Sequence, residues 1–310
     1  MSFVTSLRRR LHQAQSPDEG FTLIELLVTI LLASGIVAGL MYLAVETLQS
    51  DQRESDRTET QRDMQLALTF IESELRQAVF VYNADCLTAE PGCPDENPWG
   101  LDLPGDMTPV LAFWRLQPFP PNVRDACEDG SADAIPCLSG NSYALVVYSI
   151  GTQGPGAGLE DLKGEAGIFR SEMSVTTPDG DGYVSPFSSA SAEFGAWPPD
   201  GEAPEFSDPT LLVDYVDSGT GSLAAEDEPS CPTPDDFYEL TPSADVGAPR
   251  SFYACVSDPD VATATAGNQD VVLYLRGNAV GRSGLQRNDT FLPPIESRVF
   301  IRGTLDKLPG

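Results

Sequence analysis

The chain has 310 residues, 47 of them acidic and 18 basic, which gives a formal net charge of −29 at pH 7. This length allows one or two domains and a sizeable core. Binding to nucleic acid or to anionic lipid through a basic patch requires clustered Lys and Arg, so the charge balance argues against both functions. The acidic excess is compatible with bound cations or with a basic partner. The simplest explanation is that the net charge keeps the protein soluble.

Residues 1–20 have the composition of a processing segment rather than of a folded element. They contain three consecutive arginines at positions 8–10, the single histidine His12, and a turn-rich sequence at 16–20. We therefore treat residues 1–20 as a leader outside the fold. Because arginines favour the cytoplasmic side of a membrane, they place the chain that follows a membrane span on the opposite side.

An apolar run at residues 21–45 is long enough to cross a bilayer as a helix, since about 20 residues at about 1.5 Å rise span a hydrocarbon core of about 30 Å. The run contains Glu25, and burying an ionised carboxylate in lipid costs several kcal/mol unless a cation pairs with it. Cleavage between Gly20 and Phe21 would supply that cation, a new α-amino group, on a neighbouring copy. The alternatives are a single-pass anchor with Glu25 at the lipid interface, and a secretory signal peptide, whose apolar region is shorter at about 7–15 residues.

The Gly20-Phe21 junction, the Thr22-Leu23-Ile24-Glu25 sequence after it and the apolar run resemble the class III signal of type IV pilins, type II secretion pseudopilins and their relatives. The resemblance covers about the first fifth of the chain. It implies cleavage after Gly20 by a membrane prepilin peptidase and methylation of the Phe21 amine. It also implies assembly with other pilin or pseudopilin subunits at an inner-membrane platform, with Glu25 helping to register the subunits.

A second, finer resemblance concerns the distal part of the chain. The overall pattern, including the Leu275-Arg276-Gly277-Asn278-Ala279 sequence and the closing strand expected at Arg298–Gly303, is similar to cyanobacterial pseudopilins associated with hormogonium polysaccharide secretion. This resemblance implies a filament that serves polysaccharide secretion and motility. A minor pilin of a motility or DNA-uptake pilus is the alternative within the same family.

The segment after the apolar run is expected to continue the helix outside the membrane. Residues 46–63 are polar on all sides and contain no Pro or Gly, as in a solvated helix. Apolar residues then recur at spacings of three and four, which predicts one buried helical face; they are Met64, Leu68, Ile71, Leu75 and Val79. We expect one helix from Phe21 to about Tyr82, with residues 46–82 as its extracytoplasmic continuation.

Residues 83–310 have the sequence pattern of a β-rich globular domain, with Pro, Gly, Asp and Ser between short apolar runs. The predicted strands are 110–116, 143–150, 167–175, 211–216, 252–256, 271–276 and 298–303. The connections 117–141, 176–210 and 218–250 exceed ordinary loop lengths, which is typical of functional or disordered loops or of undetected short elements. The predicted fold class is α+β: a long N-terminal transmembrane and spine helix packed on an antiparallel β-sheet, with long loops pinned by disulfides.

All six cysteines follow the apolar run and so lie on the side that is oxidising in bacteria. An even count there indicates disulfides, although six cysteines allow 15 pairings. Pairing of nearest neighbours is favoured because each pair brackets a loop rich in Pro, Gly or Asp; the pairs are Cys86 with Cys93, Cys127 with Cys137, and Cys231 with Cys255. A zinc site would need paired short Cys or His spacings, which the sequence lacks.

The sequence carries no arrangement that predicts catalysis or a cofactor. His12 lies in the leader, so the processed chain lacks the imidazole base of a Ser/His/Asp or Cys/His site. A turn that contains Asp179 and Asp181 is a weak calcium candidate, because the distal bidentate Glu of the full motif is missing. We expect a minor pilin or pseudopilin that is not an enzyme. A membrane-anchored extracytoplasmic binding protein that does not polymerise is the alternative from another class.

Overall fold

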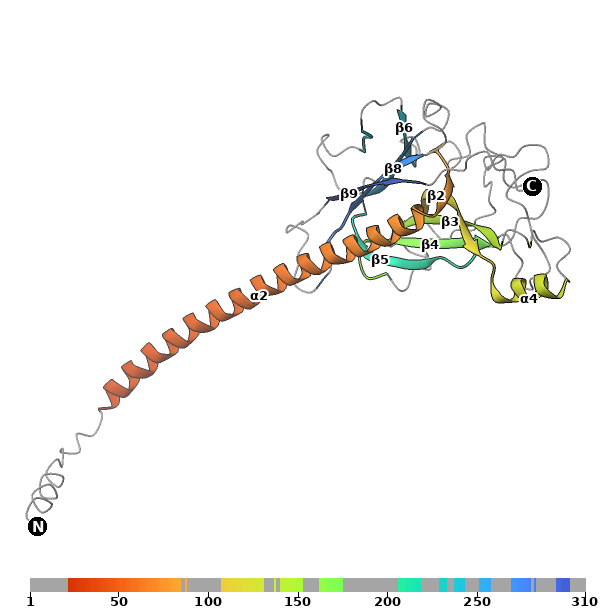
Figure 1. Cartoon of the computed structure of the whole chain (residues 1–310). Helices are drawn as coiled ribbons and strands as arrows, with labels where there is room; N and C mark the ends of the chain where they lie inside the picture. Colours follow the sequence, from red (N-terminus) through yellow and green to blue (C-terminus); the bar gives the residue numbers. More distant parts are fainter. Residues whose placement is uncertain are drawn as a thin grey trace, which may run out of the picture. The chain divides into compact units, whose positions relative to one another are not determined.

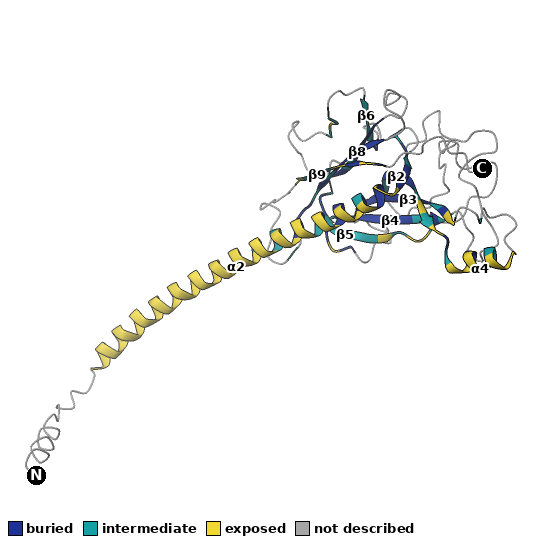
Figure 2. Ribbon diagram, in the orientation of Figure 1, coloured by how far each residue is buried: buried dark blue, intermediate teal, exposed yellow. Residues whose placement is uncertain are grey.

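In the computed structural model the described residues are 22–84, 87, 107–130, 137, 140–152, 162–174, 206–218, 229–232, 237–242, 251–257, 269–279, 282 and 294–301. The chain divides into two compact units, residues 1–52 and 53–310. Helix α2 (Leu23–Leu75) contributes residues to both units (Figure 1). In the first unit every described residue, from 22 to 52, is exposed (Figure 2).

The described residues of the second unit form two antiparallel sheets (Figure 1). The first has five strands in chain order, β1 (Ala78–Val81), β2 (Thr108–Pro118), β3 (Asn141–Thr152), β4 (Ala166–Ser174) and β5 (Thr210–Val216). The second has four, β6 (Tyr238–Thr241), β7 (Phe252–Ser257), β8 (Asp270–Arg276) and β9 (Pro294–Phe300). A long N-terminal apolar helix with antiparallel sheets confirms the predicted α+β class.

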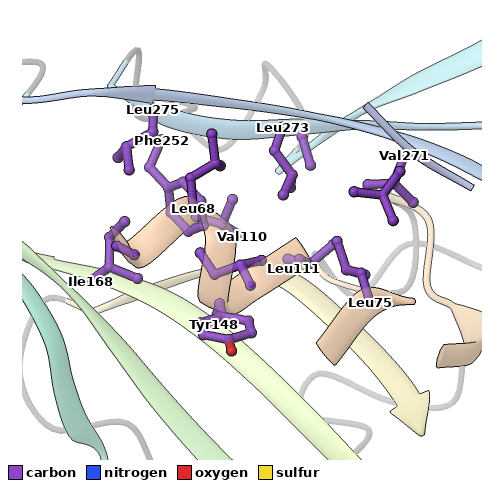
Figure 3. Close-up of a cluster of buried hydrophobic side chains, with 14 of the residues drawn as sticks. Leu68, Leu75, Val110, Leu111, Tyr148, Ile168, Phe252, Val271, Leu273 and Leu275 are labelled. Atoms are coloured by element: carbon purple, nitrogen blue, oxygen red, sulfur yellow. The ribbon is translucent and has the colours of Figure 1, made fainter. Parts of the chain in front are cut away.

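One buried hydrophobic cluster joins residues 64–75 of α2 to both sheets. Figure 3 shows Leu68 and Leu75 of the helix with side chains that come from strands of the two sheets. The first sheet contributes Val110, Leu111, Tyr148 and Ile168, and the second contributes Phe252, Val271, Leu273 and Leu275. Four positions of the predicted apolar stripe, Met64, Leu68, Ile71 and Leu75, are buried in this cluster, so the helical periodicity identified the face that packs.

Two contacts at opposite ends of β8 link the sheets. After β8, Gly277 forms an isolated antiparallel bridge with Val216 at the end of β5. Before β8, the side-chain amide of Gln269 accepts a hydrogen bond from the Val81 N–H and donates one to the Val81 carbonyl, both at 2.9 Å. Gln269 therefore takes the place of a strand neighbour beside β1.

Helix α2 ends at Leu75, seven residues before the expected end near Tyr82. Residues 78–81, Ala-Val-Phe-Val, instead form β1 and pair with β2, where Ala78 lies opposite Arg115 and Val81 opposite Phe113. β-branched and aromatic side chains fit a pleated, half-buried surface, so pairing with β2 overrides the helical period at these positions. Val79 is buried as predicted, but in a strand.

The remaining differences concern short elements and the number of sheets. The expected loop 117–141 contains helix α4 (Pro121–Asp129), with Pro in its first turn and Gly130 at its C-terminal end in the left-handed conformation (φ 74°). Strand β6 lies in the expected loop 218–250, and β9 begins at Pro294 rather than at position 298. The strands form two sheets where the sequence led us to expect one.

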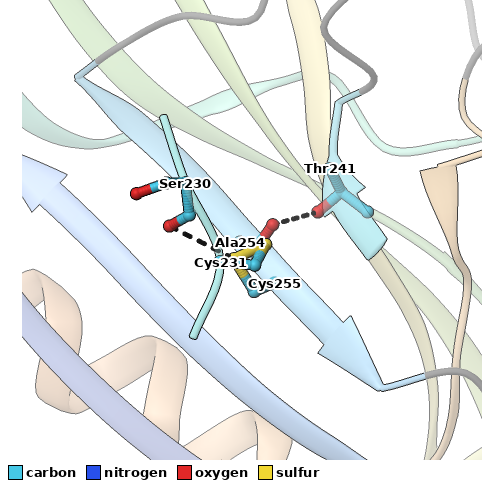
Figure 4. Close-up of a disulfide and its surroundings, with 5 residues drawn as sticks. All are labelled: Ser230, Cys231, Thr241, Ala254 and Cys255. Carbon is cyan, nitrogen blue, oxygen red and sulfur yellow. Dashed lines mark hydrogen bonds between the residues drawn. A yellow bond between two sulfur atoms is a disulfide. The ribbon is translucent and has the colours of Figure 1, made fainter. Parts of the chain in front are cut away.

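Two predicted disulfides are confirmed. Cys127–Cys137 connects α4 to residue 137, and Cys231–Cys255 connects residues 229–232 to β7, each with a Cα–Cα distance of 5.6 Å. Figure 4 shows the second disulfide beside Thr241, whose hydroxyl donates a 3.2 Å hydrogen bond to the Ala254 carbonyl. The predicted pair Cys86 and Cys93 lies outside the described residues.

Candidate membrane and assembly segment

The first half of α2 presents a continuous apolar surface. All of its large apolar side chains between Leu23 and Leu48 are exposed, and contiguous exposed apolar surfaces of this kind mark interaction sites or membrane contacts. By length and composition, α2 is the one helix among the described residues that could cross a membrane. The apolar stretch is therefore a candidate membrane segment.

The threonine and serine hydroxyl groups of this segment, at Thr29, Ser34 and Thr47, form hydrogen bonds with the helix's own backbone. Thr29 donates to the Leu26 carbonyl at 2.9 Å, Ser34 to the Leu31 carbonyl at 2.9 Å, and Thr47 to the Leu43 carbonyl at 2.8 Å. A hydroxyl without a partner costs several kcal/mol in an apolar medium. These three hydroxyl groups are thus satisfied within the helix, as an apolar medium requires.

Thr22 caps the N-terminus of α2. The Glu25 N–H donates to the Thr22 hydroxyl oxygen at 3.3 Å and to the Thr22 carbonyl at 3.0 Å, and the Leu26 N–H donates to the same carbonyl at 3.1 Å. Glu25 lies in the first turn, where the helix dipole favours a negative charge. A capping role for Thr22 was not among the predictions, although a Thr three residues before a Glu is the signature of a capping box.

Two glycines leave part of the apolar segment open to close approach. A Cβ added at Gly35 or at Gly39 would meet nothing within 4 Å. Small residues four apart let two membrane helices bring their backbones together. The pair is therefore compatible with helix packing between copies.

Several predicted site residues lie outside the described residues. These include the cleavage junction, the third cysteine pair and the calcium candidates, namely Gly20, Phe21, Cys86, Cys93, Asp179 and Asp181. Processing and calcium binding therefore stay predictions. Within the described ranges, no group of three or more His, Cys, Asp or Glu side chains could hold a metal ion.

A buried charge network lies where α2 meets the first sheet. Glu74, 6% exposed, accepts hydrogen bonds from Arg170 Nε at 2.9 Å and Arg170 Nη2 at 2.8 Å, and from the Tyr148 hydroxyl. Arg115 pairs with Glu172 at 3.1 Å, and Arg170 also pairs with Glu172. The network combines two cations with two anions, so it leaves little net charge in the interior.

The network changes the pKa of Glu74. Burial raises the pKa of this carboxyl, but the hydrogen bonds and charge of Arg170 and the hydrogen bond from Tyr148 outweigh burial and hold it below its ordinary value of 4.5. Burial and the Glu74 charge raise the pKa of Tyr148. Glu74 is thus an ionised acceptor that fixes the end of the helix on the sheet. No sequence pattern pointed to Glu74, because its partners lie 74 to 96 residues away along the chain.

Comparisons with protein-family models, with curated proteins and with solved structures found no match. The family resemblance therefore depends on the residues around the Gly20-Phe21 junction and on the properties of the helix that follows.

Proposed function

We propose that this chain is a minor pilin or pseudopilin subunit that is cleaved after Gly20, N-methylated at Phe21 and incorporated into a type IV pilus-like or secretion pseudopilus filament. The observation that carries the proposal is an exposed apolar helix that begins directly after Thr22 and holds Glu25 in its first turn. The sequence before it is the Gly20-Phe21 junction. The subunit acts by assembly and not by catalysis.

The apolar segment supports a membrane position in which two carboxylates bracket the span. Residues 26–45 lie between Glu25 and Glu46, and about 20 residues match a hydrocarbon core of about 30 Å. Tyr42 lies close to the distal boundary, where aromatic residues are favoured, and the arginines at 8–10 favour a cytoplasmic leader. The disulfide-containing second unit then lies on the oxidising side of the membrane.

The mechanism follows from the charge at the start of the helix. Before assembly, Glu25 at the membrane boundary is favoured by the dipole of its own helix. After cleavage, the amine of Phe21 on one copy pairs with Glu25 of a neighbour as the helices pack. Loss of one member of such a pair leaves a buried charge uncompensated, at a cost of about 3–5 kcal/mol. The partners are the prepilin peptidase, other subunits and an inner-membrane assembly platform, in a filament that serves polysaccharide secretion and motility.

N-terminal mass spectrometry of the protein purified from its native membrane tests the proposal. We expect the chain to begin at a methylated Phe21. The variant Gly20→Ala should remain at full length, because the residue before the scissile bond is changed. A native chain that still begins at Met1 would contradict the proposal and favour an anchored binding protein that does not polymerise.

A further inference from the structure

The two sheets of the second unit differ in how their outermost strands are used. In the first sheet, the side-chain amide of Gln269 bonds to both backbone groups of Val81 in β1. At the other side of that sheet, the Asn278 N–H donates to the Tyr215 carbonyl in β5 at 2.7 Å. Both outermost strands of the first sheet thus have a partner from outside that sheet. The outermost strands of the second sheet are β6 and β9.

Strand β9 presents backbone groups of three residues away from its sheet. The Ile301 N–H donates to the Gln269 carbonyl at 3.1 Å, in the register that pairs β9 with β8. Antiparallel neighbours exchange hydrogen bonds at every second residue, so the odd-numbered residues of β9 bond to β8. The N–H and carbonyl groups of Glu296, Arg298 and Phe300 therefore point away from β8. Within the described part of the chain, no group bonds to them there.

Strand β6 presents outward backbone groups for the same reason. The Arg276 N–H donates to the Ser251 carbonyl at 2.6 Å, which continues the register of β7 with β8. The odd-numbered residues of β7 thus bond to β8, and its even-numbered residues bond to the odd-numbered residues of β6. The backbone groups of Tyr238 and Leu240 point outward, and no described residue bonds to them on that side.

The two open strands are complementary in direction and in register. Two antiparallel strands separate them, so β6 and β9 run in opposite directions, and β9 of one copy is antiparallel to β6 of a copy placed beside it in the same sense. One row of directly opposed residues crosses the whole sheet, from Leu240 through Cys255 and Val272 to Arg298. Extending this row into a second copy places that copy's Leu240 opposite Arg298.

This register also gives acceptable neighbours to the other side chains of β9. Phe300, which is 65% exposed, lies opposite Tyr238 of the second copy, and Ser297 lies opposite its Thr241. Aromatic pairs and Thr–Ser pairs stabilise antiparallel sheets, whereas opposed like charges destabilise them. The charged side chains of the strand face Pro242 and Leu240, so no like charges are opposed.

We propose that the second sheet joins copies of this chain head to tail, with β9 of one copy pairing antiparallel with β6 of the next. A pair of copies still has one free β6 and one free β9, so the contact can be repeated, as heterologous contacts are in open assemblies. Charges on an outermost strand discourage pairing with arbitrary strands. The proposal concerns the second unit alone and does not depend on the proposed function.

Photo-crosslinking of the full chain in detergent micelles tests the contact. Phe300 is replaced by p-benzoylphenylalanine, and a mixture of isotope-labelled and unlabelled protein identifies crosslinks between copies by mass spectrometry. We expect crosslinks to residues 237–242 of a second copy. The same replacement at Phe70, which is 43% exposed on α2, is the control and should not crosslink to residues 237–242. Crosslinks confined to residues 294–301 of the second copy, or none between copies, would overturn the proposal.

A proline in β9 tests whether the backbone makes the contact. The Glu296 N–H points away from β8, so Glu296→Pro removes a bond to the next copy and keeps every bond to β8. In the protein that carries benzoylphenylalanine, crosslinking should be about fivefold weaker in Glu296→Pro than in Glu296→Ala, the loss expected from one hydrogen bond. The two variants should have equal urea midpoints. Equal crosslinking in both would overturn the proposal, because the backbone of β9 would then take no part.

Discussion

The two halves of α2 show how the side chains of one continuous helix can suit two different environments. From Leu23 to Leu48 the large apolar side chains are exposed, and the hydroxyls of Thr29, Ser34 and Thr47 bond to the helix's own carbonyls. From Arg53 to Leu75 the apolar side chains of one face are buried against two sheets. Tertiary packing accounts for most helix stability in water, whereas a helix in lipid must satisfy its backbone internally. The comparison therefore separates a segment suited to lipid or to other copies from one suited to its own domain.

The largest expected effect is on assembly through the exposed half. In the proposed mechanism, Glu25→Ala removes the partner of the amine of a neighbouring copy, at a cost of about 3–5 kcal/mol, so the variant should be cleaved normally and fail to enter filaments. Mass spectrometry of the N-terminus and immunodetection in sheared filaments measure the two steps. Glu46→Ala, which removes the carboxylate at the other end of the span, should assemble. Normal incorporation of Glu25→Ala would contradict the mechanism.

The two halves should also differ in how much stability they lose when a leucine side chain is shortened to alanine. Leu68→Ala removes a fully packed side chain and should lower the free energy of unfolding of the second unit by about 2–5 kcal/mol. Leu31→Ala makes the same chemical change at an exposed position and should alter that free energy by less than about 0.5 kcal/mol. Urea unfolding in detergent, followed by tyrosine and tryptophan fluorescence, measures both. Equal losses would mean that the halves are not energetically distinct.

The buried half should respond to pH through Glu74. Because the folded-state pKa of Glu74 lies below its ordinary value of 4.5, the unfolded state takes up the proton first as pH falls. The carboxylate's contribution is fully present above the unfolded pKa and is lost as pH falls through the folded pKa. Urea midpoints between about pH 6 and about pH 3 should therefore fall more steeply for the parent than for Glu74→Gln. Parallel curves would contradict this assignment, and the exposed Glu54→Gln should match the parent.

The smallest expected effect is at the N-terminus of the exposed half. Thr22→Ala removes the hydroxyl that accepts the Glu25 N–H and should destabilise the first turn by about 1 kcal/mol. Hydrogen exchange of residues 23–26 in micelles measures the change. Thr22→Ser keeps the capping oxygen and should behave like the parent. Identical exchange in Thr22→Ala would mean that the hydroxyl does not cap the helix.

Local sequence patterns predicted much of the fold. Apolar spacing identified the buried positions of α2, runs of β-branched and aromatic residues located seven strands, and cysteine proximity predicted two disulfides. The same helical spacing misplaced the end of α2, because Val79 continues the period of Leu75 while pairing with β2 decides the structure there. Periodicity records which side chains are buried, and it does not record which backbone partner they find.

Features that depend on distant partners could not be predicted. Glu74 reaches Arg170, and Arg282 reaches Asp63 across 219 residues. Each of these charges looks like solvated surface when only its neighbours in the chain are considered. The division into two sheets was also missed, because strand patterns do not reveal which strands pair. In the membrane segment, by contrast, the Thr22–Glu25 cap is local and could have been read from the sequence.

The side chain of Gln269 has a consequence for solubility. Strand β1 lies at the margin of its sheet, where unpaired backbone groups invite foreign strands to add and aggregates to grow. The amide of Gln269 occupies both backbone groups of Val81 on that margin. A single side chain thus blocks this point of the sheet edge, even when many copies are crowded together.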